Sequence, residues 1–414
     1  MSVYRFAVLG AGNGGQAIAA HLAARGMDVI LFNRRVERLE PLLAAGTLRV
    51  SGAVEATVPV TLHRTGKEKT HGTRAGSRAN TRCGVVWVTD RVEEAAKADV
   101  LMVTVPATAH AELGRLLAPH VREGQVIVLN PGRTLGALEM EMALQGRDGR
   151  DDGPTRDGAW PDGGRLRGRM GSGRGPTVAE AQSLLYAARV VGPAHVHVFS
   201  IKRWVVLAAL PAWRTRLVLD RIRGVFPQFQ AAPSVLHTSL DNIGAIFHPA
   251  PVLLNLARVE AGESFDHYHQ GMTPAVVRVL EAADEERLAV ARALGVEIPS
   301  AREWLSLAYR AAGEDLYRAL QGNTAYTGIK APSDLNTRYL WEDVPTGLVP
   351  LASLGEAAGV PTPTLNSLIH LASLVHGIDY LHHGRTLRNM GLSDISCGGV
   401  DFLRTYVLEG GEAA

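Results

Sequence analysis

The sequence predicts an α/β N-terminal domain followed by an all-α C-terminal domain. Three observations support this fold class. A short apolar run ends in the glycine-rich segment Gly10–Gly15, strand-like and helix-like runs then alternate as far as Leu210, and long helical patterns dominate after Pro211. Repeated β and α units of this kind form a parallel sheet covered by helices.

The length of the chain also predicts two domains. Its 414 residues, 46% of them hydrophobic, exceed what one core holds, since a domain typically has roughly 100 to 200 residues. We place the boundary after Pro211, which gives domains at 1–211 and 212–414. Residues 64–82 and 147–176 are nearly free of large apolar side chains, and we expect them to be disordered or mobile surface insertions.

The composition favours small-molecule chemistry. The 43 basic and 41 acidic residues give a net charge of only +2, and acidic residues interrupt the arginines of the second insertion, so we expect no nucleic acid partner. Cys83 and Cys397 form neither a zinc motif nor a disulfide framework, so we expect no metal and a cytoplasmic protein. The residues before the first strand lack the features of a secretory signal and no apolar run reaches the ~18 residues of a membrane span, so we expect no membrane partner.

The periodicity of apolar residues predicts the elements of both domains. In the first domain it predicts strands at 4–9, 27–32, 85–88, 100–105, 125–129, 195–199 and 204–210 and helices at 16–25, 107–117 and 178–189. In the second domain it predicts helices at 212–225, 276–294, 300–312 and 364–377.

The segment Gly10–Gly15 has the GxGxxG spacing of a Rossmann-like dinucleotide-binding domain. Gly10 suits the tight turn, Gly12 the approach of backbone to pyrophosphate, and Gly15 the close packing of helix on strand. The free amides of the helix N-terminus would face the anion. We predict that Gly10, Gly12, Asn13, Gly14 and Gly15 bind the cofactor; the alternative is a glycine-rich turn without a ligand.

The end of the second strand bears on the choice of cofactor. A carboxylate there would bind the ribose hydroxyls of NAD, but the sequence reads Phe32-Asn33-Arg34-Arg35. An amide beside two guanidiniums suits the 2′-phosphate of NADP. We therefore predict NADP(H) bound by Asn33 and Arg34, with NAD(H) as the alternative cofactor and plain surface charges as the alternative interpretation.

Two loops follow later strands and are predicted to line the nicotinamide end. Ligands of an open α/β sheet lie outside the carboxyl ends of its strands. Thr104–Ala107 and Asn130–Thr134 occupy this position, and we assign Pro106 to the cofactor and Thr134 to the substrate. Ordinary proline and glycine turns are the alternative.

Two polar clusters stand out in the second domain. Residues 239–255 place His248 and the amide of Asn242, a candidate substrate contact, in an apolar segment broken by prolines. Residues 338–350 combine Arg338, two acids including Asp343, and aromatic side chains before a Pro/Gly turn. Taken alone, each cluster also fits a structural role, as a buried histidine with a partner or a salt bridge at a helix end.

Five separated segments resemble the octopine and nopaline dehydrogenases, also called opine dehydrogenases. They are GAGNGG, LNPGRT followed by GALE, AEAQSLLYAAR, HPAPVLLN and RYLWEDVPTGLVP, and they occur in the family's order. The resemblance as a whole reaches from Tyr4 to about Leu392, outside the two insertions. The resemblance implies an NAD(P)-dependent oxidoreductase acting on CH–NH groups, with catalytic residues in the C-terminal domain. Such enzymes join the α-amino group of an amino acid to an α-keto acid such as pyruvate and reduce the imine with NAD(P)H.

The resemblance also implies roles for single residues. His248 and Asp343 would form the catalytic acid–base dyad, and Arg338 would bind a substrate carboxylate. Histidine suits proton donation near neutral pH, and a carboxylate on its second ring nitrogen would orient it. The expected partners are an amino acid and an α-keto acid, with the chain as a homodimer and no nucleic acid or membrane.

Two other functions remain open at this point. One is a different two-domain reductase, related to ketopantoate reductase or glycerol-3-phosphate dehydrogenase, which would need a catalytic lysine; Lys202 and Lys330 do not lie in the expected setting. The other is a dinucleotide-sensing protein without catalysis. A large separation between His248 and Asp343 would favour it.

Overall fold

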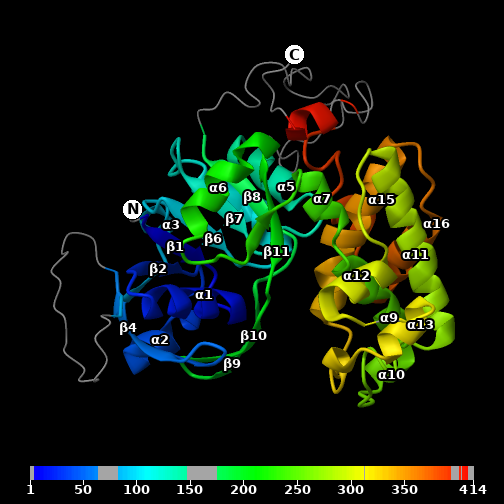
Figure 1. Cartoon of the computed structure of the whole chain (residues 1–414), viewed down its shortest axis with the longest axis horizontal. Helices are drawn as coiled ribbons and strands as arrows, with labels where there is room; N and C mark the ends of the chain where they lie inside the picture. The colour runs from blue at the N-terminus through cyan, green and yellow to red at the C-terminus, as the bar shows by residue number, and fades with distance from the viewer. Residues whose placement is uncertain are drawn as a thin grey trace. The chain divides into compact units, whose positions relative to one another are not determined.

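The computed structural model describes residues 4–63, 83–146, 175–311, 313–392, 401 and 403–408. Both predicted insertions lie outside these residues, except for Gly175 and Pro176 at the end of the second. The chain forms two compact units (Figure 1). The first contains Met1–Val105, Glu112–Pro131 and Ser172–Ala231, and the second contains Pro106–Ala111, Gly132–Gly171 and Ala232–Ala414.

The first unit is built on one sheet whose strands run in the order β12-β11-β8-β7-β6-β1-β2-β5-β4-β3-β10-β9. Strands β5-β2-β1-β6-β7-β8 are parallel throughout and reproduce the 3-2-1-4-5-6 order of dinucleotide-binding folds. The strands are β1 Phe6–Leu9, β2 Val29–Phe32, β3 Thr47–Gly52, β4 Ala56–Leu62, β5 Val86–Thr89, β6 Val100–Val103, β7 Val126–Leu129, β8 Thr177–Ala181, β9 Tyr186–Gly192, β10 His195–Ile201, β11 Val205–Leu210 and β12 Phe229–Ala231.

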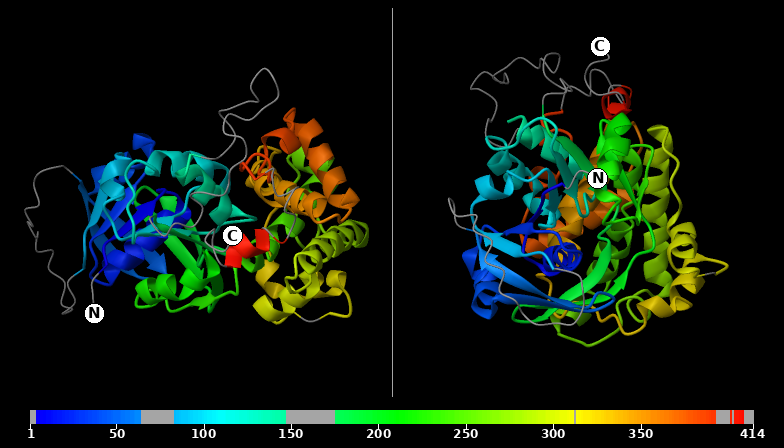
Figure 2. Two further views of the ribbon diagram at one scale, coloured as in Figure 1. Left: turned by 90° about the horizontal axis from the view of Figure 1, so that it is seen from above. Right: turned by 60° about the vertical axis from the view of Figure 1, so that its left-hand side comes forward.

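The composition of the central strands explains their place in the sheet. Every residue of β1, β6 and β7 is buried, as expected for parallel strands covered on both faces. Helices of this unit are α1 Asn13–Ala24, α2 Glu40–Ala45, α3 Val92–Ala95 and α6 Thr215–Ile222, while α4 His110–Leu117 begins in the second unit's segment. Helix α1 packs against seven strands that are consecutive in the sheet, β1, β2, β5, β4, β3, β10 and β9. This part of the sheet therefore curves around the helix (Figure 2).

One predicted element of this unit is wrong. Residues 178–189 were predicted as a helix, but they form β8, a turn and the start of β9. Their alanines and leucines favour a helix, yet β8 is buried between β7 and β11, and β9 pairs with β10. Pairing on both edges outweighs the local helix propensity.

The division of the chain also differs from the predicted boundary. Helix α6 and strand β12 follow Pro211 but belong to the first unit, because β12 pairs in parallel with β11. In return, two segments of the N-terminal half, Pro106–Ala111 and the loop and helix α5 after β7, belong to the second unit. The predicted division at 211 therefore cuts through the sheet.

The second unit is helical in its described residues. Its helices are α5 Gly136–Leu144, α7 Val235–Leu240, α8 Gly244–Phe247, α9 Pro249–Leu254, α10 Leu256–Glu260, α11 Pro274–Ala293, α12 Ala301–Tyr309, α13 Leu316–Gln321, α14 Arg338–Trp341, the π-helix Val344–Leu348, α15 Val349–Ala357, α16 Pro363–His376 and α17 Tyr380–His383. Helices α11 and α16 pack together, as do α9 and α16 (Figure 1). In the described part of the chain, we find no helix with the length and apolar character that crossing a membrane requires.

Local signals set the ends of these helices. Ser300 and Glu303 form a complete capping box at the start of α12, and Gly377 takes a left-handed conformation (φ +64°) just after α16. Thr273 caps α11 by accepting a hydrogen bond from the amide of Val276. The helices predicted at 276–294 and 364–377 therefore match α11 and α16 closely.

Arg385 ties the two N-terminal segments of this unit to its helices. Its fully buried guanidinium donates to Glu139 Oε2 on α5 from Nε (2.9 Å) and Nη2 (2.6 Å). It also donates to three carbonyls, those of Ala107, Gly132 and Thr134. One side chain thus links the segment after β6, the loop after β7 and helix α5.

Replacing Arg385 by methionine should destabilise the protein strongly. The change removes the guanidinium that pairs with the buried Glu139 carboxylate and donates to three carbonyls, and breaking a buried pair in this way costs about 3–5 kcal/mol. Chemical denaturation followed by circular dichroism measures the loss. Arg216→Met, which breaks the exposed Arg216–Asp220 pair, should leave the unfolding curve unchanged. Equal curves for the two variants would contradict this role of Arg385.

Candidate active site

The glycine-rich loop has the geometry that a dinucleotide needs. Gly10 adopts φ +114°, a conformation that side chains rarely take, and a Cβ on Gly15 would lie 1.7 Å from the carbonyl oxygen of Gly10. A Cβ on Gly12, in contrast, would meet no atom within 4 Å. Gly10 and Gly15 are therefore required for the turn itself, whereas Gly12 keeps open space beside the N-terminus of α1, where backbone amides lack helical partners.

Three other predicted cofactor residues make contacts of their own. Asn13 Oδ1 accepts a hydrogen bond from the Val190 amide (2.9 Å), and Asn33 Oδ1 accepts one from the Ala11 amide (3.1 Å). The side chains of Asn13 and Asn33 therefore support the glycine-rich loop. Arg34 is half-exposed and forms an ion pair with Glu112. Pro106 precedes the short 3-10 helix Ala107–Ala109 and lies in a segment of the second unit.

In the second unit, His248 and Asp343 lie side by side although 95 residues separate them in the chain. Nδ1 of His248 is 2.8 Å from Oδ2 of Asp343. His248 occupies the junction of α8 and α9, where Pro249 starts a new helix, and Asp343 precedes the π-helix 344–348. The Asp343 side chain is 1% exposed and that of His248 is 19% exposed, so the imidazole keeps an accessible edge.

Three further charges surround this pair. Arg133 Nη1 lies 2.9 Å from Asp343 Oδ1, and Arg133 Nε lies 3.8 Å from Glu342 Oε1. Arg338 contacts Glu342 Oε2 through both Nε and Nη2 at 2.5 Å. Burial alone would raise the pKa of Asp343, but the Arg133 guanidinium and then His248 hold this pKa below its usual value. Asp343 is therefore a carboxylate at neutral pH.

Aromatic rings cover the imidazole. The Tyr339 ring stacks on His248 with centroids 4.2 Å apart and planes at 13°. The His267 ring lies 4.9 Å from that of Tyr339 and 6.5 Å from that of His248, and its Nε2 is 3.2 Å from the Phe247 carbonyl oxygen. Burial, and then the nearby His248, lowers the pKa of His267 to about 4. His267 is thus neutral at neutral pH.

Thr134 and Asn242, the predicted substrate contacts, bond to each other. Asn242 Nδ2 donates to Thr134 Oγ1 (3.2 Å), and Thr134 Oγ1 donates to the Ser239 carbonyl (3.1 Å). Both side chains are buried, so the hydrogen bonds fix the loop after β7 to helix α7. Their contact with a substrate stays a prediction. Among the described residues, no cluster of three or more His, Cys, Asp or Glu side chains is arranged to bind a metal ion.

Family models match both parts of the chain. Residues 231–376 match the model described as NAD/NADP octopine/nopaline dehydrogenase, alpha-helical domain, and residues 6–137 match that of ketopantoate reductase PanE/ApbA. An opine dehydrogenase from Arthrobacter sp. (strain 1C) is 37% identical over 395 residues, covering 95% of this chain and 97% of that protein. The chain belongs to the opine dehydrogenase family. Its members are NAD(P)-dependent oxidoreductases acting on CH–NH groups, and their activity is the reductive condensation of an amino acid with an α-keto acid.

More distant opine dehydrogenases share the architecture. An octopine dehydrogenase from Mizuhopecten yessoensis is 26% identical over 404 residues, which cover 91% of each chain. The solved structure of octopine dehydrogenase with NADH and L-arginine superposes with a TM-score of 0.71 at 22% identity, covering 96% of this chain and 98% of that one. Yersinopine dehydrogenase with NADP+ gives 0.65 at 17% identity, covering 94% and 97%. The predicted two-domain fold is therefore confirmed.

The two competing interpretations fare differently. The family model of ketopantoate reductase matches residues 6–137, whereas the helical part of the chain matches the model of the octopine/nopaline dehydrogenases. Lys330 forms an exposed ion pair with Asp266, and Lys202 contacts Ser183. A non-catalytic sensor would have no need to hold an acid and a base together, and the 2.8 Å contact between His248 and Asp343 counts against it.

Several members of this charged and aromatic cluster escaped the sequence-based prediction. Arg133 lies beside the predicted Thr134 in the same LNPGRT segment, and Glu342 lies beside Asp343 in RYLWEDVP, so both were within the matched motifs. Tyr339 follows Arg338 in the same way. His267 and Arg385 carry no comparable motif, and only the folded chain reveals their contacts.

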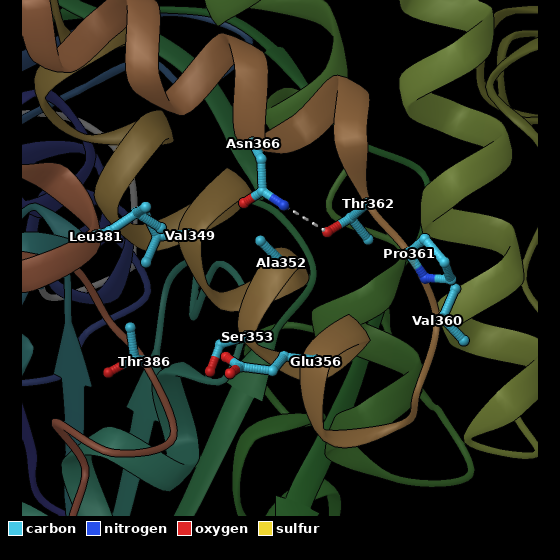
Figure 3. A pocket seen from close by; sticks show the side chains of 10 residues that line it. All are labelled: Val349, Ala352, Ser353, Glu356, Val360, Pro361, Thr362, Asn366, Leu381 and Thr386. Carbon is cyan, nitrogen blue, oxygen red and sulfur yellow. Dashed lines mark hydrogen bonds between the residues drawn. The ribbon is translucent and has the colours of Figure 1, made fainter.

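A separate cavity of about 310 Å³ lies among α15, α16 and α17 of the second unit (Figure 3). Its lining combines apolar side chains with Ser353, Glu356 and Thr386, and two further lining residues bond to each other, Asn366 Nδ2 donating to Thr362 Oγ1 (3.2 Å). None of the predicted site residues lines this cavity. It is therefore distinct from the His248 cluster.

Substituting Gly12 by alanine should leave the fold intact while weakening dinucleotide binding. The methyl group enters open space in the loop, where it would block the approach of a pyrophosphate, so we expect the dissociation constant for NADPH to rise at least about tenfold. Fluorescence titration measures the affinity, and a thermal melt without cofactor reports the fold. Gly15→Ala, which would clash with the Gly10 backbone, should lower the melting temperature. Unchanged NADPH affinity in Gly12→Ala would argue against the assigned cofactor loop.

Proposed function

We propose that this opine dehydrogenase joins a pyruvate-like α-keto acid to the α-amino group of an amino acid and reduces the imine with NADPH in preference to NADH. The observation that supports the catalytic part is the contact of His248 with a buried, ionised Asp343. When bound, the dinucleotide supplies the hydride. The chain's own residues must bind the two substrates and manage protons at the reacting nitrogen and oxygen.

His248 is proposed as the proton donor. Loss of water from the carbinolamine requires a proton on the leaving oxygen, and an imine accepts a hydride readily only when its nitrogen is protonated. Asp343 accepts a hydrogen bond from Nδ1 of His248, which fixes the ring and leaves Nε2 as the nitrogen that exchanges a proton with substrate. The carboxylate also stabilises the imidazolium.

Arg338 is proposed to bind a substrate carboxylate. Its side chain is 55% exposed, and the Glu342 carboxylate contacts its Nε and Nη2. The third nitrogen, Nη1, takes no part in this ion pair. A guanidinium held by a buried carboxylate is oriented before the substrate arrives, which lowers the entropic cost of binding. Octopine dehydrogenase has been solved with pyruvate and with L-arginine, which supports a keto acid and an amino acid as substrates here.

The preference for NADPH rests on Arg34 and Arg35. Both are exposed at the end of β2, where Asn33 replaces the acid that would repel a phosphate. Glu112 pairs with Arg34, so a 2′-phosphate would compete with this carboxylate for the guanidinium. A cytoplasmic location and a homodimer also belong to the proposal; the free thiol of Cys83 suits a reducing compartment.

His248→Asn should abolish most of the turnover without affecting cofactor binding. Asparagine keeps a polar side chain but cannot donate a proton near neutral pH, so we expect kcat to fall about 10²- to 10⁴-fold. NADPH oxidation with pyruvate and a panel of amino acids measures it, and fluorescence titration follows NADPH binding. His370→Asn, on the exposed face of α16, serves as the control with unchanged rate. Near-normal turnover in His248→Asn would exclude His248 as the proton donor.

Arg34→Ala should change the cofactor preference. Loss of this cation removes a partner of the 2′-phosphate, so we expect the KM for NADPH to rise about tenfold while the KM for NADH stays constant. Glu112→Gln should have the opposite effect on NADPH, because it releases Arg34 from its ion pair. Arg38→Ala, an exposed neighbouring cation, controls for general charge effects. Equal changes for both cofactors would contradict 2′-phosphate recognition by Arg34.

A further inference from the structure

Arg133 holds an unusual backbone conformation directly beside the dyad. Its φ is +62° and that of Leu135 is +60°, both in the left-handed region. For residues other than glycine this conformation is strained and persists only where the surroundings enforce it. The loop after β7 therefore depends on strong contacts.

Those contacts come from several elements of the second unit. Arg385 Nη1 donates to the carbonyls on either side of Arg133, those of Gly132 (3.2 Å) and Thr134 (2.6 Å). The Thr134 amide donates to the Thr346 carbonyl (3.1 Å), and the Leu135 amide donates to Ser239 Oγ (2.9 Å). The backbone around Arg133 is thus fixed from helix α7, the π-helix and the segment after α17.

This backbone delivers the Arg133 guanidinium to one place. The side chain is 15% exposed, with Nη1 2.9 Å from Asp343 Oδ1 and Nε 3.8 Å from Glu342 Oε1. A Cβ on Gly244 would lie 2.7 Å from Arg133 Nη1, so a larger residue there would displace the guanidinium from this position. Asp343 therefore has a different partner at each oxygen, the Arg133 guanidinium at Oδ1 and the His248 imidazole at Oδ2.

Electrostatics explain why a cation is required here. Glu342 and Asp343 are adjacent in the chain and each is 1% exposed. Two neighbouring carboxylates in a site shielded from water repel each other, and one of them takes up a proton unless cations compensate. Arg133 is the residue that approaches both, while Arg338 contacts Glu342 and His248 contacts Asp343.

We infer that Arg133 is a positioning residue for the dyad: it keeps Asp343 ionised with Oδ2 towards His248, and it thereby sets the pH range in which His248 donates its proton. This inference rests on the proposed acid–base role of His248. It adds to Arg338, whose proposed role is the grip on a substrate carboxylate. Arg133 acts through Asp343 and needs no contact with the substrate.

The groups around His248 fix the direction of the expected change. Asp343 bonds to its Nδ1, Tyr339 stacks on its ring, and His267, 6.5 Å away, is kept neutral by burial. Arg338 lies beyond Glu342, and Arg133 is the cation nearest to Asp343. Without the charge of Arg133, a proton shared between Asp343 and His248 is bound more tightly, whichever group carries it.

Arg133→Gln tests the inference by two measurements. In the reductive direction, we expect activity to fall as pH rises, because the reaction takes up a proton that the dyad is proposed to supply. We expect this descending limb of kcat/KM to move up by about one pH unit, and kcat at neutral pH to fall about tenfold or more. NMR titration of the His248 imidazole without substrates should show a midpoint displaced in the same direction. Arg133→Lys, which keeps a cation, should restore most of the original midpoint.

Controls separate this role from the alternatives. Arg338→Gln should chiefly raise the KM for the keto acid and move the limb less than Arg133→Gln does. Arg133→Met, whose unbranched stem fills the same space, takes the place of Arg133→Gln if the latter does not fold. The inference is overturned if removing the charge leaves both midpoints unchanged, or if only the KM for the keto acid rises. Normal turnover in His248→Asn would instead refute the proposed function, while the NMR midpoint would still test Arg133.

Discussion

The candidate site depends on the burial of two adjacent carboxylates, Glu342 and Asp343. Taking an ion out of water costs several kcal/mol, and two like charges side by side add their repulsion. The fold meets this cost with two guanidiniums and an imidazole from three parts of the chain: Arg133 after β7, Arg338 on α14 and His248 between α8 and α9. The charges alternate from Arg338 to Glu342, Arg133, Asp343 and His248, so each carboxylate lies between two positive or protonatable groups. Helix packing in the second unit brings these elements together.

This requirement also explains why the second unit includes pieces of the N-terminal half. Arg133 can reach Asp343 only if the loop after β7 is fixed to the helices, and Arg385 provides that link through Gly132, Thr134 and Glu139. The same guanidinium donates to the Ala107 carbonyl, and the Ala107 amide donates to Glu342 Oε1 (3.1 Å). The segment at 106–111 is therefore part of the electrostatic environment of Glu342. Because each unit contains three separate segments of the chain, one domain boundary cannot describe the two units.

The fold and the site differed in how far the sequence could predict them. The glycine-rich loop and the central strands follow from local patterns, because turn geometry and burial on both faces leave clear signatures at Gly10, Gly15 and in β1 and β7. Residues 178–189 were wrongly predicted as a helix, because their helix propensity is a local property whereas β8 and β9 form by pairing with strands elsewhere in the sheet. The contact of His248 with Asp343 joins residues 95 positions apart, so the resemblance to opine dehydrogenases predicted it and residue chemistry alone did not. Arg133 was missed because its contacts are with Glu342 and Asp343, far away in the sequence, and leave no local pattern.

The environment also distinguishes the two histidines of the cluster. His248 and His267 both contact the Tyr339 ring, yet His267 is 1% exposed, and this burial keeps its ring neutral although its Nε2 lies 3.2 Å from the Phe247 carbonyl oxygen. His248 has an ionised carboxylate on Nδ1, a stacked aromatic face that favours a cation, and an exposed edge. The carboxylate and the stacked ring both stabilise a protonated imidazole, and the exposed edge gives it access to substrate. These features suit a group that must gain and lose a proton in contact with substrate. His267 then packs against Tyr339 as a neutral ring, so it limits the movement of the tyrosine that covers His248 without adding a competing charge.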